Sequence, residues 1–205
     1  QTAVIGTSAE AARADHVHTA PGRLLGVQRL TSGNYTKTPG TNTIVVHGIG
    51  GGGGGGGGEK GVGSIGVGAG GGSGQYIIHR ETGLGAGPFP ATYGTAGAGG
   101  IAGNNPDTNG GASTLTLSVV LTANGGKGGG SMAAAVSASF AAGGAAGTGA
   151  SNANLSTQGG TPGENGSRAG TISTSQISGS GGSSPIGSGG EAIFNANLNG
   201  KVGTG

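Results

Sequence analysis

Two histidines near the start of the chain, His16 and His18, are the side chains best suited to binding a metal ion. In an extended segment, side chains two residues apart point to the same side of the backbone. A single chain therefore offers an incomplete ligand shell. Three chains around a threefold axis would complete an octahedral set of imidazole nitrogens, which suits Fe²⁺ or a similar transition metal. The alternative is that both histidines are exposed at a turn capped by Asp15.

Aromatic and polar side chains between the glycine-rich stretches are candidates for contact with a receptor. Phe89 and Tyr93 lie in an insert that two prolines stiffen. A polar turn that could hydrogen-bond to glycans or protein loops contains Asn104, Asn105 and Asp107. Aromatic anchors with polar surroundings are the usual composition of a recognition surface. We therefore expect these residues to bind a receptor, with the alternative that Phe89 or Tyr93 fills a small β core.

No pattern of catalytic residues stands out. We find no Gly-X-Ser-X-Gly elbow, phosphate-loop lysine or Ser/His/Asp grouping. Gly-X-Gly patterns arise by chance at this glycine content, and none lies between a clear strand and a helix as a dinucleotide site requires. We expect a protein that is not an enzyme.

The composition excludes a hydrophobic core of the size found in ordinary domains. Of 205 residues, 56 are glycine, 8% are charged and 3% are aromatic. Glycine loses more backbone freedom on folding than any other residue. Either the chain is a disordered low-complexity segment, or glycine itself is the unit that packs.

Charge and hydropathy exclude further classes of protein. The formal net charge is +2 and the basic residues are scattered singly, so we expect no nucleic-acid partner. No apolar run is long enough to span a membrane, and there is no cysteine for a disulfide. The sequence starts at Gln1 without a charged and apolar leader, so we expect a processed form or a piece of a longer protein.

Short β-like segments alternate with glycine-rich stretches, of which 50–58 is an unbroken glycine run. A period-two apolar pattern predicts a single strand with one apolar face over 115–121, and Ser131 could begin a short helix in the Ala-rich stretch 131–142. The other strands are expected at 23–30, 41–47, 75–80 and 194–198.

Glycine-rich stretches of this kind could pack in several ways. Collagen needs glycine strictly at every third position, which the run 50–58 breaks. A flexible linker needs no β-branched strands between its glycine tracts. Extended helices of the polyproline-II type have three residues per turn and no internal hydrogen bonds, so their backbone groups must pair with neighbouring segments when buried. We expect stacked helices of this type, with the inserts displayed as loops at the ends of the stack.

An ordered series of short motifs resembles the glycine-rich domain of bacteriophage tail fibres. The series is Thr31–Thr36, then Pro39-Gly40, then Ile44–Gly50 and the glycine run. Tyr35 stands where that family usually has Trp, and His47 stands where it usually has an acidic or aromatic residue. Further upstream, Ala11–His18 is similar to a segment of tail-fibre shafts.

The resemblance implies a virion protein at the distal tip of a tail fibre. It implies a homotrimer, joined to other tail proteins upstream, that binds an outer-membrane protein or glycan on the bacterial surface without entering the membrane. In such fibres a His-X-His motif clamps the trimer through a metal ion, which implies this role for His16 and His18. The expected domains are a fibre stem, 1–40, and a receptor-binding tip, 41–205.

The fold class expected from the residues and the resemblance together is mainly β and irregular. A short trimeric stem precedes a small β element and a sandwich of stacked polyglycine-II helices. Two alternatives come from other classes of protein. A glycine-rich ice-binding protein would show a regular Gly-X-X period with flat rows of Thr or Ala, and a structural matrix segment would behave as a random coil.

Overall fold

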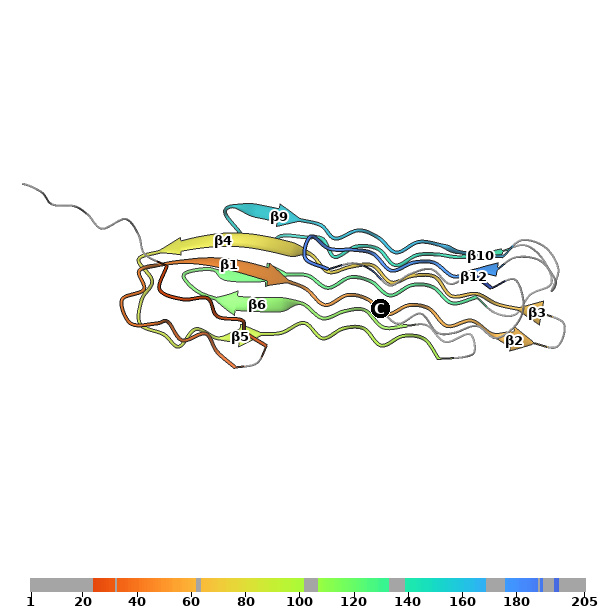
Figure 1. Ribbon diagram of the computed structural model, residues 1–205, viewed down its shortest axis with the longest axis horizontal. Helices are drawn as coiled ribbons and strands as arrows, with labels where there is room; N and C mark the ends of the chain where they lie inside the picture. The colour runs from red at the N-terminus through yellow and green to blue at the C-terminus, as the bar shows by residue number, and fades with distance from the viewer. Residues whose placement is uncertain are drawn as a thin grey trace, which may run out of the picture.

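A computed structural model shows an elongated, mainly β molecule (Figure 1). It describes residues 24–31, 33–61, 64–101, 107–132, 139–168, 176–187, 189 and 194–195, and these contain no helix. Strands lie towards both ends, and extended glycine-rich segments run between them. The strands are β1 (Thr43–Ile49), β2 (Lys60–Gly61), β3 (Ser64–Ile65), β4 (Tyr76–Thr82), β5 (Ala91–Thr92), β6 (Ser113–Thr116), β7 (Val120–Ala123), β8 (Ser139–Ala141), β9 (Ser156–Gln158), β10 (Gly166–Arg168), β11 (Gln176–Ile177) and β12 (Phe194–Asn195).

Two three-stranded sheets pack together at one end, which we call the β end. Their strand orders are β1-β4-β9 and β5-β6-β7, and all pairs are antiparallel. β1 and β4 confirm the strands expected at 41–47 and 75–80, with each strand shifted by one or two residues. Ile77, Leu121 and Ala123 form a small buried cluster between the sheets. This cluster is far smaller than the core of an ordinary domain, as the composition predicts.

The single strand expected at 115–121 is wrong, because this segment is a hairpin. Leu115 pairs with Leu121 across β6 and β7, and Thr116 pairs with Val120. The amide of Leu117 donates to the carbonyl oxygen of Val119, which reverses the chain. The alternating apolar residues therefore face one another across two short strands instead of lining one long strand.

The other expected elements differ in part from the structure. Residues 24–30 contain no strand. In the Ala-rich stretch 131–142, the described residues form β-bridges at Ser131 and Met132 and the strand β8, and no helix. β12 (Phe194–Asn195) lies within the stretch 194–198, where a strand is expected.

Glycine-rich segments connect the strands of the two ends and lie alongside one another (Figure 1). They bond to one another through backbone amides and carbonyls. We number them in chain order as segment I (50–59), II (66–75), III (93–101), IV (107–112), V (124–132), VI (142–150), VII (159–165) and VIII (178–183).

The hydrogen bonds of segment I repeat at every third residue. The amides at every third position from Gly50 donate to segment II, and the amides one residue further on donate to segment IV. Carbonyl oxygens of segment I accept hydrogen bonds from amides of segments III and V. The bonds to segment II join Gly50 to Gln75, Gly53 to Gly72 and Gly56 to Ala69, at 3.0, 2.8 and 2.8 Å. A single strand of a sheet bonds to two neighbours in one plane, whereas segment I bonds to neighbours in several directions.

Segment II lies at the centre of this arrangement. It bonds to segments I, V, VI, VII and VIII, again with a three-residue repeat. Its amides at Ala69, Gly72 and Gln75 donate to segment V, and those at Gly70 and Ser73 donate to segment VII. The backbone of segment II is thus surrounded by other backbones instead of by side chains.

Most glycines in these segments have no space for a side chain. A Cβ at Gly53 would overlap the carbonyl oxygen of Lys127, and a Cβ at Gly74 would overlap that of Gly50. Two positions differ: a Cβ at Gly52 or at Gly99 would meet a single atom, at 3.8 and 3.7 Å. Close approach of backbones, more than loop flexibility, explains the glycine content.

The end opposite the β end, which we call the far end, carries a second set of strands. These are the four-stranded sheet β12-β11-β10-β8 and the hairpin β2-β3. Val67, Ala69, Met132 and Ala141 form a buried cluster beside this sheet. Both ends therefore combine short strands with a small apolar cluster, and the glycine-rich segments span the distance between them.

Candidate functional site

Phe89 and Tyr93 lie at the β end, where they hold an earlier part of the chain. The backbones of Phe89 and Tyr35 exchange hydrogen bonds of 2.8 and 2.9 Å, and their rings stack with centroids 5.8 Å apart. The Tyr93 hydroxyl donates to the carbonyl oxygen of Gly33 at 2.5 Å. Burial raises the pKa of the Tyr35 hydroxyl. Both candidate receptor-binding residues thus have a structural contact, and their binding role stays a prediction.

Asp107 lies away from these aromatics, at the start of segment IV. Its carboxyl group packs so closely on Gly128 that a Cβ there would overlap it. Oδ2 is buried and has no hydrogen-bond partner within the described structure. Loss of solvent raises the pKa of Asp107, although bonds from its own amide and that of Gly129 act in the opposite direction. The structure therefore does not bring Asp107 together with Phe89 and Tyr93.

The remaining predicted site residues lie outside the described residues. These are His16 and His18, the expected metal ligands, and Asn104 and Asn105 of the polar turn. Within the described ranges, no group of three or more His, Cys, Asp or Glu side chains could hold a metal ion. Iron binding at the histidines therefore stays a prediction, as does the domain boundary between residues 40 and 41.

The far-end sheet exposes an apolar row that the sequence did not indicate. Phe140 on β8 pairs with Ser167 on β10, and Ser167 pairs with Ile177 on β11. Directly paired residues of an antiparallel sheet lie on the same face. The Phe140 side chain is 74% exposed and Ile177 is 41% exposed. We call Phe140, Ser167 and Ile177 the far-end row, and the same register continues to Phe194 on β12.

The opposite face of this sheet is anchored in the molecule. Ala141 and Gly166 are a pair on the neighbouring position of the register, and both are buried. Ala141 contacts the cluster that contains Val67 and Met132. A Cβ on Gly166 would lie 3.2 Å from a methyl group of Val67. The sheet therefore has one fixed face, and the far-end row lies on the other.

Further exposed apolar side chains occur in this half of the molecule. Ile101, at the last described position before 102–106, is 69% exposed. Isolated exposed apolar residues are common on protein surfaces, but an aromatic in a row with a second apolar residue is a candidate contact surface.

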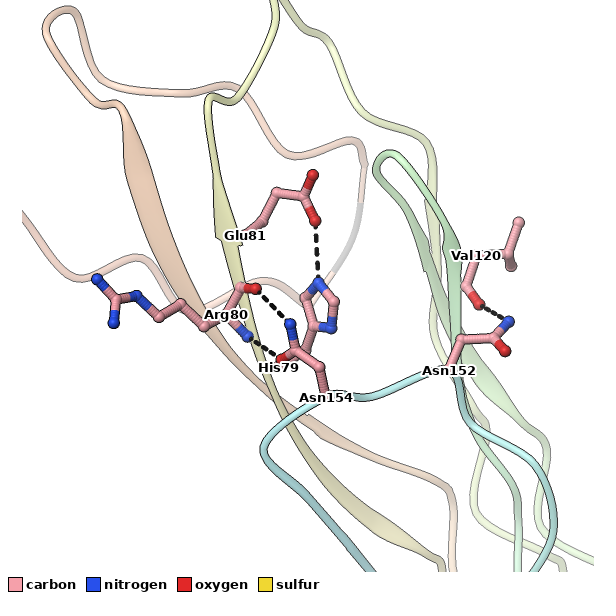
Figure 2. A network of polar contacts seen from close by, with 6 residues as sticks. All are labelled: His79, Arg80, Glu81, Val120, Asn152 and Asn154. Atoms are coloured by element: carbon pink, nitrogen blue, oxygen red, sulfur yellow. Dashed lines mark hydrogen bonds and ion pairs between the residues drawn. The ribbon is translucent and has the colours of Figure 1, made fainter.

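A histidine and a glutamate form a buried pair at the β end. His79 Nε2 lies 3.0 Å from Glu81 Oε2, and the two side chains are 4% and 14% exposed (Figure 2). Hydrogen bonds from His79 and from Ser118 lower the pKa of Glu81. The other ring nitrogen, His79 Nδ1, is buried and has no partner among the described residues. Through Glu81, which bonds to His79 and to Ser118, this arrangement links β4 to the β6–β7 turn.

Two asparagines tie the adjacent loop to both sheets of the β end. The Asn154 side chain accepts from the Arg80 amide at 2.9 Å and donates to the Arg80 carbonyl at 2.8 Å (Figure 2). It thereby extends the β4–β9 pairing with a side chain in place of a backbone. Asn152, with a φ of 54°, donates to the carbonyl oxygen of Val120 at 2.9 Å. The β end is thus braced by specific polar contacts.

The two ends of short strands, joined by segments that pack through their backbones, define a glycine-rich all-β class of protein. The family described as a glycine-rich domain matches residues 30–205, and the chain belongs to this family. No curated protein and no solved structure matches the chain. In the described part of the chain, no helix is long and apolar enough to cross a membrane.

Proposed function

We propose that this protein is the distal receptor-binding tip of a bacteriophage tail fibre and attaches the virion to the bacterial surface. The tail-fibre motifs in 31–50 support the assignment. The single observation that carries it is the far-end row, an exposed apolar surface at one end of an elongated, backbone-packed molecule. A tip protein needs this separation, because one end faces the fibre and the other faces the host.

In this proposal the glycine-rich segments are polyglycine-II helices. Their hydrogen bonds repeat every third residue, which is the period of a helix with three residues per turn. Each turn directs amides and carbonyls to several neighbours, as segment II does. Such a scaffold is held by many backbone bonds, so its end loops can change in sequence without loss of the scaffold.

The receptor contact in this proposal is centred on Phe140 and Ile177. Burial of these side chains against a partner supplies the apolar contribution, and the Ser167 hydroxyl between them supplies a polar contact. The expected partner is an outer-membrane protein or a surface glycan. Phe89, Tyr93 and Asp107 remain secondary candidates, since each already has an internal contact.

Binding of the purified full chain to a panel of bacteria tests this function. The proposal predicts saturable binding to particular strains, and loss of that binding in receptor-deficient mutants of those strains. A chain that is monomeric and adsorbs to no bacterium would refute the proposal. A measurement of ice-growth inhibition separates the ice-binding alternative, which predicts activity without any cell.

A further inference from the structure

A polar groove with a volume of about 330 Å³ lies on the surface of the glycine-rich scaffold, over segments IV, V and VI. Its lining combines two alanines and the backbone of two glycines with four polar side chains, those of Asn109, Asn124, Lys127 and Thr148. The described lining contains no aromatic or large apolar side chain. The volume is in the range of small-molecule sites, and the composition suits a small hydrophilic ligand.

The floor of this groove is backbone that hydrogen bonds between segments hold in place. The Gly110 amide donates to the carbonyl oxygen of Gly126 at 2.8 Å. The Lys127 amide donates to that of Ala145 at the same distance of 2.8 Å. A Cβ on Gly125 would overlap the carbonyl oxygen of Gly110. Segments IV, V and VI therefore have a fixed spacing, and a ligand would find the groove preformed.

Hydrogen-bond donors and a positive charge lie at one end of the groove. Oδ1 of Asn109 accepts from the Gly128 amide at 3.1 Å, which identifies the oxygen and leaves the NH₂ group as a donor. Lys127 directly precedes Gly128 and is exposed. Among the described acidic side chains, none forms an ion pair with Lys127. The charge of Lys127 is therefore available to an anionic group at this end.

The other end of the groove offers an acceptor and a hydroxyl group. Nδ2 of Asn124 donates to Oε1 of Gln75 at 3.0 Å, and Nε2 of Gln75 donates to the Gly149 carbonyl oxygen at 2.8 Å. This chain of bonds orients the Asn124 amide and leaves its Oδ1 as an acceptor. Thr148 is exposed and lies next to Gly147, where a Cβ would overlap the Asn124 carbonyl oxygen. Its hydroxyl can both donate and accept.

We propose that this groove binds a saccharide that carries a carboxylate or phosphate group. Lys127 pairs with the anionic group, and Asn109 donates to it. Sugar hydroxyls, each a donor and an acceptor, fit Asn124 and Thr148. Asn124 and Lys127 are three residues apart, which is about 9 Å in an extended helix with a rise of about 3.1 Å per residue. One sugar ring with its anionic substituent spans this distance, whereas a nucleotide base or an apolar side chain would find no aromatic surface here.

NMR titrations of the isotope-labelled full chain with glucuronic acid and with a glucose phosphate ester test the proposal. We expect saturable shifts in the side-chain amide signals of Asn109 and Asn124 with both probes. Glucose, acetate and inorganic phosphate should each bind at least about threefold more weakly than the anionic sugars, because each lacks either the charge or the hydroxyls. The groove is separate from the far-end row, so the proposal does not depend on the proposed function.

Three variants assign the interaction to particular side chains. Lys127→Gln should weaken binding of both anionic sugars at least about threefold. Asn109→Asp keeps an oxygen for the Gly128 amide but replaces the donor by a negative charge, and should abolish binding. Arg29→Gln is the matched control, since it removes one positive charge from an exposed residue at the β end and should bind as the unaltered chain does.

Several outcomes would overturn the proposal. Shifts that are absent, or that spread over the molecule instead of gathering at the groove, would mean that no site exists. Glucose that binds as tightly as the anionic sugars would show that the Lys127 charge is not used. Acetate or phosphate that binds as tightly would show a simple anion site, and unchanged binding by Lys127→Gln would contradict the pairing. Adsorption to bacteria is measured separately, so none of these results bears on the far-end row.

Discussion

The amide of Gly53 donates to the carbonyl oxygen of Gly72 at 2.8 Å, and the two backbones lie in direct contact. A Cβ on Gly53 would overlap the Lys127 carbonyl of a third segment, and a Cβ on Gly72 would overlap that of Ala145. Contacts of this kind recur every third residue along segments I and II. They provide the close packing that large apolar side chains provide in ordinary domains.

Replacement of Gly53 by alanine should destabilise the protein severely. The added methyl group has to displace backbone of segment V, so we expect a loss of about 3 kcal/mol in the free energy of unfolding. Gly52→Ala and Gly99→Ala are matched controls with open space at Cβ, and should change stability by less than about 1 kcal/mol. Urea unfolding of the three variants measures the contrast. Equal losses at all three positions would show that backbone contact does not determine the glycine requirement.

Acid should weaken the β end through Glu81. Because the pKa of Glu81 is lowered in the folded protein, its contribution to stability is complete above the ordinary pKa of 4.5 and is lost as the pH falls through the lowered value. Glu81→Gln should therefore flatten the dependence of the melting temperature on pH in the acid range. The exposed Glu164→Gln variant serves as the control and should retain the wild-type dependence. If Glu81→Gln leaves the dependence of the melting temperature on pH unchanged, Glu81 is not responsible for a loss of stability in acid.

The opposite sign is expected at Asp107. Its pKa is raised mainly by loss of solvent, so the folded state bears a cost whenever the carboxylate is charged. Asp107→Asn should raise the free energy of unfolding at neutral pH by about 1 kcal/mol. This gain should shrink as the pH falls towards the ordinary pKa of 3.8, where the wild-type group becomes protonated. Thermal melts at several pH values measure both effects, and a variant less stable than wild type at neutral pH would contradict them.

Metal analysis of the purified protein tests the expected role of His16 and His18 as metal ligands in a homotrimer. The prediction is iron or a similar transition metal in a fixed ratio of one ion to three chains. His16→Ala and His18→Ala should each abolish binding of the metal and weaken the trimer, as measured by mass spectrometry and sedimentation. His47→Ala is the control, since His47 contacts Tyr76 on β4 and should leave the metal content unchanged. A trimer that contains no metal would contradict the prediction that a metal ion joins the three chains.

The sequence predicts the local elements better than it predicts the candidate site. β-Branched runs indicate β1 and β4, and the glycine content indicates a scaffold without a large core. The period-two pattern at 115–121 failed because Ser118 reverses the chain, a turn that the alternation of Leu and Val conceals. The glycine run 50–58 has no internal pattern, so the partners of each glycine cannot be deduced from it.

The far-end row depends on contacts between segments that are distant in the sequence. Phe140, Ser167 and Ile177 meet only because β8, β10 and β11 pair in one register. No short motif in the chain encodes that register. Phe89 and Tyr93 were predicted to bind because two prolines make their insert distinctive, whereas Tyr35 and Gly33, which contact them, lie far upstream. Phe140 is exposed, whereas Phe89 packs against Tyr35. This difference depends on the fold and cannot be deduced from the residues next to each phenylalanine in the sequence.

Adsorption of the full chain to sensitive bacteria, compared between the Phe140→Ala and Leu155→Ala variants, tests whether the far-end row binds the receptor. Both side chains are exposed and apolar, at 74% and 57%, but Leu155 lies at the β end and Phe140 at the far end. If the far-end row binds the receptor, Phe140→Ala should weaken binding at least about tenfold, while Leu155→Ala should bind as the unaltered chain does. Equal binding by the two variants, or a loss confined to Leu155→Ala, would contradict it.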